Sequence, residues 1–254
     1  MTQPIGAKTT KQGRKYEGLP SVTTVLGIIN KPGLSWGAAK ETALFAVHHP
    51  EEWQHLSPED AVSRLYRHHK GVWTDKGARG TEIHTIAQQW TNGEAVDVPV
   101  EYTPYVDALE AFYNDHRPTW IAVERTVIDR RRGYGGTFDA IAQIGDRLLL
   151  IDLKTGKRYP AEVVLQLAAY RFAEAMAIYD EAGALVNTEP MPEVDGAAVV
   201  YLHDDGTYEM LELPADEKAM VAFMAALELW KSMAELEAWV KRHPEIKSTK
   251  EVAA

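Results

Sequence analysis

Residues 135–157 read GGTFDAIAQIGDRLLLIDLKTGK, and this segment is the most informative part of the chain. Its alternating residues predict two β-strands joined at Gly145 and Asp146, a dipeptide that is typical of the two-residue turns in tight hairpins. In that register Ile144 faces Arg147. The segment therefore predicts an antiparallel hairpin whose pairing can be counted residue by residue.

Continuing the same register places Asp139 opposite Asp152, at a separation of about 5 Å across the two strands. Side chains alternate along a strand, so Lys154 lies on the same face as both aspartates. Two half-buried carboxylates this close raise the pKa of one of them and lower stability. A divalent cation would remove that penalty, and oxygen ligands favour Mg²⁺ or Mn²⁺.

Both faces of the predicted hairpin are largely apolar. A sheet with two apolar faces is covered on both sides, which predicts an α/β fold with a mixed central β-sheet flanked by helices. One face carries Ile141, Leu148 and Leu150 beside the charged trio, and the other carries Phe138, Ala140, Ala142, Leu149, Ile151 and Leu153.

Composition limits the possible classes of protein. The chain has 254 residues, of which 45% are hydrophobic, so it can form one large domain or a core with an added helical lobe. It has no cysteine, which excludes disulfides, cysteine-ligated zinc and an iron–sulfur cluster. The sequence shows neither a membrane-spanning apolar run nor the apolar stretch of a signal peptide. We expect a cytoplasmic protein without a membrane partner.

The formal net charge of −10 argues against a nucleic-acid partner, but the charges are unevenly distributed. Residues 124–158 contain eight Lys or Arg and five Asp or Glu, a local excess of +3. The basic residues Arg130, Arg131, Arg132, Lys157 and Arg158 are therefore candidates for DNA contacts. A solvated turn explains the three consecutive arginines equally well.

The remaining elements give an order of helices followed by strands. We predict a mainly helical N-terminal lobe over residues 1–118 and a core with a C-terminal helix over residues 119–254, packed as one compact unit. The predicted helices cover a short segment from Ser21, then 35–48, a start at 57–60, 78–91, 104–116, 160–179 and 216–241. The predicted strands outside the hairpin cover 120–128, 197–203 and 208–213.

This order and four short motifs resemble the PD-(D/E)XK nuclease superfamily, in particular its RecB-type branch, which includes phage exonucleases and members without an iron–sulfur cluster. The segment GGTFD, with Asp139, resembles the GxxD element, and IDLKTGK, with Asp152 and Lys154, resembles the DxK element. The resemblance extends over roughly residues 20–210. It is completed by LQLAAY with Gln166 and Tyr170, similar to QxxxY, by RGTEIH with His84, similar to GTxxH, and by the opening SVTTVLGIINKPGLSWGAAKETA.

The resemblance implies a restriction-endonuclease-like core and a set of metal ligands. Asp139 and Asp152 would bind the ion together with the backbone carbonyl of Leu153, and His84 from the N-terminal lobe would complete or flank the metal shell. Glu124, in the strand upstream of the hairpin, is a further candidate acid. As a single acid in a strand, it can equally be an exposed edge residue.

The resemblance also implies roles in catalysis. Lys154 would orient or help to deprotonate the attacking water and would stabilise charge on the phosphate. Gln166 and Tyr170 lie one helical turn apart, and thus on one face, where they would brace the site or touch DNA.

The predicted function is a Mg²⁺- or Mn²⁺-dependent deoxyribonuclease, an exonuclease of phage DNA replication or recombination. Its partners would be DNA and a phage recombination or single-strand-binding protein, in the host cytoplasm. A structure-dependent endonuclease using the same site and a catalytically silent DNA-binding subunit are the alternatives. A binding protein unrelated to nucleic acid would leave Gln166 and Tyr170 unexplained. Polarity, strand preference, the number of ions and the oligomeric state stay open.

Overall fold

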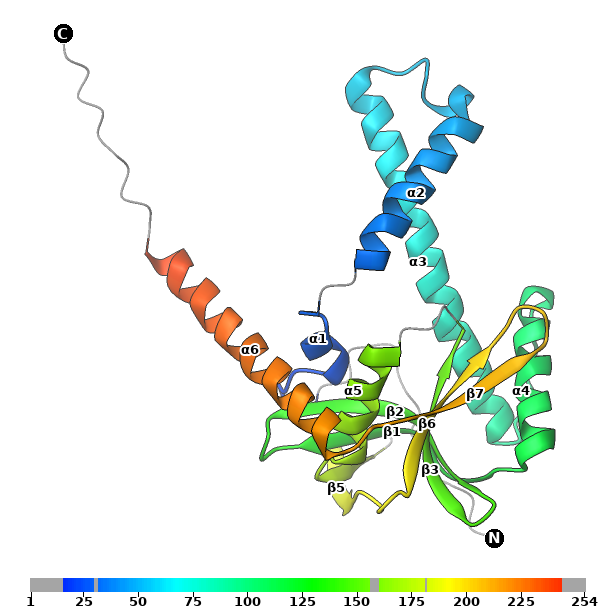
Figure 1. Cartoon of the computed structure of the whole chain (residues 1–254), viewed down its shortest axis with the longest axis vertical. Coiled ribbons are helices and arrows are strands. Elements are labelled where there is room, and N and C mark those ends of the chain that lie inside the picture. The colour runs from blue at the N-terminus through cyan, green and yellow to red at the C-terminus, as the bar shows by residue number, and fades with distance from the viewer. Residues whose placement is uncertain (1–15, 30–31, 156–159, 181, 244–254) are drawn as a thin grey trace.

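The computed structural model describes residues 16–29, 32–155, 160–180 and 182–243 (Figure 1). These residues form a seven-stranded sheet in the order β5-β4-β1-β2-β3-β6-β7. β3 and β6 run parallel, whereas the other neighbouring strands are antiparallel, so the sheet is mixed as predicted. The strands are β1 (Thr119–Asp129), β2 (Tyr134–Ile144), β3 (Arg147–Lys154), β4 (Ala175–Tyr179), β5 (Leu185–Pro190), β6 (Gly196–Leu202) and β7 (Tyr208–Leu213).

The β2–β3 hairpin has the predicted register. Ile144 pairs with Arg147, and the ladder continues to Ala140 and Ile151. Gly145 has a φ of +60°, a left-handed conformation that glycine adopts without a steric penalty. The pairing of the two strands ends at Ala140 and Ile151, one position short of Asp139 and Asp152. Phe138, predicted on the face of Ala140, packs instead in the core that contains Ile141 and Leu150, so the regular alternation of β2 breaks at Asp139.

Helices cover both faces of the sheet, which confirms the prediction drawn from the hairpin's two apolar faces. On one face Ile141, Leu150 and Val199 belong to a core formed with α1, α5 and α6. On the other face Leu149 and Ile151 pack with residues of α3 and α4. The helices are α1 (Val22–Leu26), α2 (Pro32–His48), α3 (Pro58–Thr91), α4 (Thr103–His116), α5 (Pro160–Arg171) and α6 (Glu217–Arg242), with short 3₁₀ turns at Pro50–Glu52 and Val100–Tyr102.

The helix α3 is longer than the sequence predicted. It begins at the predicted cap, where Ser57 accepts a hydrogen bond from the backbone of Asp60, and continues unbroken through the segment predicted as a separate helix at 78–91. No proline interrupts it after Pro58, and the glycines at positions 71, 77 and 80 weaken a helix without breaking it. Together with α2, its first half forms an arm that projects from the sheet (Figure 1).

One predicted helix is wrong over its second half. The helix expected over residues 160–179 ends at Arg171, and Ala175–Tyr179 forms the strand β4. Met176 of this strand pairs with Val127 of β1. Pairing with an open sheet edge therefore overrides the helix propensity of the Glu-Ala-Met-Ala sequence. The strand β5 was not predicted.

Two sequence-based expectations concern the arrangement of the whole chain. Within the described residues, no helix is both long and apolar enough to cross a bilayer. The division into a lobe over 1–118 and a core over 119–254 stays a prediction.

We expect Phe223→Ala to lower the free energy of unfolding by about 3–5 kcal/mol, because this ring is fully buried against Tyr134 with ring centroids 4.9 Å apart. Val221→Ala on the same helix removes a side chain that is 68% exposed, and we expect a change within about 0.5 kcal/mol. Urea unfolding followed by circular dichroism measures both. Equal effects of the two substitutions would contradict the placement of α6.

Candidate functional site

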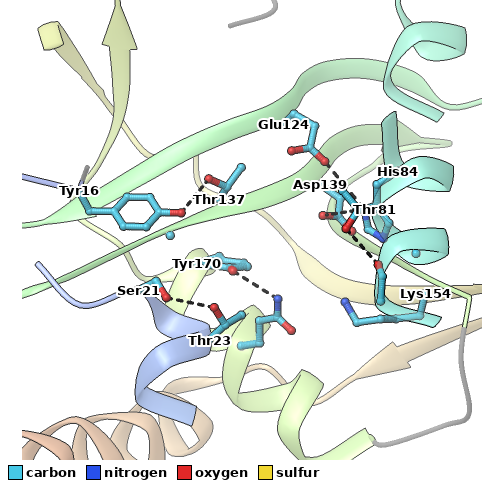
Figure 2. Close-up of a pocket in the computed structure, with 14 residues that line it drawn as sticks. Tyr16, Ser21, Thr23, Thr81, His84, Glu124, Thr137, Asp139, Lys154 and Tyr170 are labelled. Atoms are coloured by element: carbon cyan, nitrogen blue, oxygen red, sulfur yellow. Dashed lines mark hydrogen bonds and ion pairs between the residues drawn. The ribbon is translucent and has the colours of Figure 1, made fainter. Parts of the chain in front are cut away.

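A cavity of about 480 Å³ lies where α1, α3 and α5 meet β1, β2 and the end of β3 (Figure 2). It is lined by Asp139 and Lys154 of the hairpin and by polar residues from distant parts of the chain. Its lining residues are Tyr16, Ser21, Thr23, Gly77, Gly80, Thr81, His84, Glu124, Gly136, Thr137, Asp139, Lys154, Gln166 and Tyr170.

Three possible metal-ligating side chains come together at one end of this cavity. His84 of α3 places its Nδ1 3.5 Å from Asp139 Oδ1 and 3.9 Å from Glu124 Oε1. One ligand atom of each residue lies within 4.8 Å of the others. The three side chains are half-buried and come from α3, β1 and β2. The fold thus brings together a histidine and two acids that are up to 55 positions apart in the sequence.

Asp139 and His84 hold each other in charged forms. Burial alone would raise the pKa of Asp139, but the nearby positive charges of His84 and Lys154 and a 2.7 Å hydrogen bond from the backbone N–H of Leu153 outweigh it and lower this pKa. The negative charge of Asp139 is the main reason that the pKa of His84 rises to about 10. Without a bound cation, His84 is therefore protonated at neutral pH.

Asp152 and Lys154 form a second charged pair on β3. Asp152 is 2% exposed, and the Lys154 Nζ lies 2.7 Å from its Oδ1 and 2.6 Å from its Oδ2. Burial raises the pKa of Asp152 to about 6, with a further contribution from the charge of Asp139. For Lys154, the attraction of the two aspartates exceeds the effect of burial and raises its pKa. Lys154 therefore remains an ammonium ion at neutral pH.

Glu124 occupies a strained backbone position beside this cluster. β1 pairs with β2 on either side of it, through Val123 with Ala140 and Arg125 with Phe138, so Glu124 lies level with Asp139. Its φ is +49°, a left-handed conformation that costs a non-glycine residue about 1–2 kcal/mol. The sequence could not distinguish this acid from an exposed edge residue, and the structure places it in the cavity.

Gln166 and Tyr170 line the floor of the cavity from one face of α5, as their spacing predicted. The Gln166 Nε2 donates to the Tyr170 hydroxyl at 3.3 Å. Burial raises the pKa of Tyr170, so its phenol stays neutral. A Cβ atom at Gly136 would lie 2.5 Å from the Tyr170 ring, which explains why the second residue of GGTFD is glycine.

Sequence reasoning missed the opposite wall of the cavity. The Tyr16 hydroxyl lies 3.3 Å from Thr137 Oγ1, and Ser21 Oγ lies 3.0 Å from Thr23 Oγ1 (Figure 2). The segment SVTTVL contributed to the family resemblance, but nothing in it showed that its hydroxyls face the hairpin. A parallel bridge between Ser21 and Gly135 brings them there.

The predicted DNA-contacting arginines lie in the turn between β1 and β2. Arg130 pairs with Glu17 at 2.7 Å, and Arg132 pairs with Asp129 at 2.6 Å. Arg131 is exposed. Among the described residues that line the cavity, none of the three arginines occurs. Their contact with DNA stays a prediction.

Two DNA-contacting residues and one metal ligand predicted from the sequence stay predictions. Lys157 and Arg158 lie outside the described residues. Leu153 donates its N–H to Asp139, and metal binding by its carbonyl stays a prediction.

Comparisons with known proteins give weak similarity. No family model matches the sequence, and no curated protein matches it. The alkaline exonuclease LHK-Exo from Laribacter hongkongensis is 15% identical with a TM-score of 0.35, covering 64% of this chain and 82% of its own. Its complex with dAMP gives 17% identity and a TM-score of 0.32, with 64% and 81% covered. The structure of SSO0001 is 12% identical with a TM-score of 0.28, and the match covers 88% of this chain and 88% of that chain. Such values do not establish a shared activity.

We expect Asp139→Asn to lower the pKa of His84 from its wild-type value of about 10, because the main cause of its rise is lost while burial and Lys154 continue to lower it. Glu124→Gln should lower it less. NMR titration of the His84 ring in chelator measures both. In the wild type, the stabilisation from this raised pKa is complete below pH 6.5 and is lost as the pH rises through about 10. An unchanged His84 titration in Asp139→Asn would contradict the pairing.

Proposed function

We propose that this protein is a divalent-metal-dependent deoxyribonuclease of the PD-(D/E)XK superfamily, RecB-type branch, with a restriction-endonuclease-like core. One observation carries the proposal: His84, Glu124 and Asp139 converge in the same cavity as Lys154, which pairs with Asp152. We further propose an exonuclease of phage DNA replication or recombination, acting with a phage recombination or single-strand-binding protein in the host cytoplasm.

The residues present fit a hard divalent cation. Two carboxylates and one imidazole offer ligand atoms within 4.8 Å of one another, and the carboxylate oxygens are the part of this set that suits Mg²⁺ or Mn²⁺. Asp152 lies outside this group and contacts Lys154 through both of its oxygens, so metal binding by Asp152 and by the carbonyl of Leu153 stays a prediction from the resemblance. Binding would displace the proton of His84, so affinity should increase with pH. When bound, the ion would supply Lewis-acid stabilisation of phosphate charge and would make water a stronger nucleophile.

The protein's own residues supply the rest of the chemistry of phosphodiester hydrolysis. Lys154 remains cationic at the cavity wall and would offset the negative charge that grows on the phosphate oxygens in the transition state. Asp152 orients this ammonium group through contacts to both of its oxygens. Tyr170 would offer a neutral hydroxyl, which Gln166 holds in place.

The charge cluster also supports an active enzyme over a silent DNA-binding subunit. Three carboxylates surround one histidine and one lysine in a largely buried site, and unmatched buried charge destabilises a fold. Binding alone gives no reason to keep such a cluster. A catalytic cation does, because the cluster then becomes its ligand set.

We expect the wild type to release nucleotides from end-labelled linear DNA with Mg²⁺ or Mn²⁺ and to be inactive in chelator. Asp139→Asn should reduce the rate at least about 100-fold, because it removes a ligand and the partner of His84. Asp146→Asn, on an exposed residue in the turn of the same hairpin, is the matched control and should keep full activity.

Four outcomes of digestion and DNA-binding measurements would change the proposal. Wild-type inactivity with both ions would reject a nuclease, and equal rates in wild type and Asp139→Asn would reject this cavity as the active site. Cleavage of circular DNA would identify the structure-dependent endonuclease instead. DNA binding without cleavage would identify the silent subunit.

Lys154→Ala should lower the single-turnover rate by about 10²–10³-fold while changing the DNA dissociation constant much less, because the ammonium acts on charge that develops in the transition state. Lys218→Ala, an exposed lysine on α6, should change neither quantity. Filter binding and single-turnover digestion separate the two effects. A variant with weakened binding and an unchanged rate would show that Lys154 serves only to hold DNA.

A further inference from the structure

The second half of α6 extends beyond the body of the protein. Its first half is anchored by Phe223 and Leu227, which are fully buried, and Lys231 still touches the body by donating to the carbonyl of Arg132 at 3.2 Å. Every residue from 232 to 243 is exposed in the described part of the chain. Figure 1 shows this orange and red end of the helix projecting away from the sheet.

The projecting half carries a regular apolar stripe made of Leu229, Met233, Leu236 and Val240. Their exposed fractions are 54%, 46%, 59% and 62%. The spacings of four, three and four residues place all four on one side of the helix, in the a and d positions of a heptad pattern with leucine at both d positions. We call these four residues the α6 stripe.

Exposure of this stripe is unfavourable without a partner. Monomeric soluble proteins rarely expose large contiguous apolar patches, and an exposed helix of this length is marginal by itself. The anchored first half supplies a preformed helical turn, so a partner would bind a helix that is already in place. The feature is therefore suited to helix-on-helix association.

We propose that the α6 stripe pairs with the α6 stripe of a second copy of this chain in an antiparallel two-helix interface. In this register Leu229 packs on Val240 of the second copy, and Met233 packs on Leu236. Two-fold symmetry repeats both contacts, which gives four apolar layers. This interface is separate from the cavity, so it does not rest on the proposed function.

Charge and shape favour the antiparallel arrangement. The helix segment begins with Glu228 and ends with Lys241 and Arg242. Antiparallel pairing brings the acidic beginning of one segment near the basic end of the other, and it aligns the helix dipoles favourably. It also places the two protein bodies at opposite ends of the pair, as the projection in Figure 1 allows. Parallel pairing would put like charges and both bodies together.

The sequence argues against the chain's own ends as the partner. Residues 1–15 contain Met1 and Ile5 as their large apolar residues, and residues 244–254 contain Ile246 and Val252. Neither segment has apolar residues at heptad spacing. The α6 stripe of a second copy provides four such residues with matching spacing.

The oligomeric state provides the first test. By analytical ultracentrifugation, we expect the wild type to form a dimer with twice the 28.3 kDa mass of the chain. Leu236→Glu should raise the dimer dissociation constant at least about tenfold, because it buries two charges in the interface. Ala238→Glu, which places the same charge on the opposite side of the helix, should leave the dimer intact. Circular dichroism and urea unfolding check that both variants remain folded.

Disulfide trapping tests the direction of the helices in a chain without cysteine. In the antiparallel register, the cysteines of two L229C chains lie about 16 Å apart along the helix axis, too far for a disulfide. The cysteine of one L229C chain instead lies level with the cysteine of a V240C chain. Each single variant should stay uncrosslinked on mild oxidation, whereas their mixture should form a crosslinked dimer. A wild type that is monomeric at every concentration, a dimer that survives Leu236→Glu, or crosslinking within each single variant would overturn the proposal.

Discussion

Electrostatic repulsion between carboxylates in a buried pocket is the central constraint on this structure. Asp139 and Asp152 each lie one residue beyond the last recorded pair of β2 and β3, Ala140 with Ile151, and the charge of Asp139 acts on Asp152. Two cations from different elements oppose this repulsion, His84 from α3 and Lys154 from β3. As a result, the pKa values of the two carboxyl groups move apart: that of Asp139 falls, whereas burial raises that of Asp152 to about 6. Asp139 thus stays charged, whereas the charge of Asp152 depends on its surroundings.

The surrounding fold keeps these groups in place at some cost in stability. The left-handed backbone at Glu124 turns a third carboxylate toward the pair, and Gly136 leaves room for the Tyr170 ring. The Tyr134 hydroxyl donates to the Ala169 carbonyl at 2.8 Å and so ties α5 to β2. Phe223 of α6 packs on Tyr134 from the other side. The helix α5, which carries Gln166 and Tyr170, therefore packs against both the sheet and α6, and these contacts hold the two side chains in place in the cavity.

Local sequence patterns were enough to predict the geometry where it depends on a single β-turn or on one turn of a helix. The Gly145 turn set the whole β2–β3 register, and the spacing of Gln166 and Tyr170 set their common face. Contacts between distant segments were not readable. Whether Glu124 faced the site or solvent depended on a single left-handed residue.

The errors in the sequence-based fold have the same origin. Ala175–Tyr179 became a strand because β1 offers an open edge. The hydroxyls of Tyr16 and Ser21 reach the cavity only through contacts with β2. Their own sequences contain no signal for either outcome.

The two halves of α6 serve different purposes within one continuous helix. The buried positions 223 and 227 and the exposed stripe that begins at Leu229 lie on different sides of the helix, so the surface that supports α5 stays covered when the stripe is occupied. Association through the stripe would leave the packing behind the cavity unchanged. The same antiparallel pairing would hold two cavities at opposite ends of the paired helices. Substitutions in the α6 stripe would therefore leave the core contacts of positions 223 and 227 unchanged.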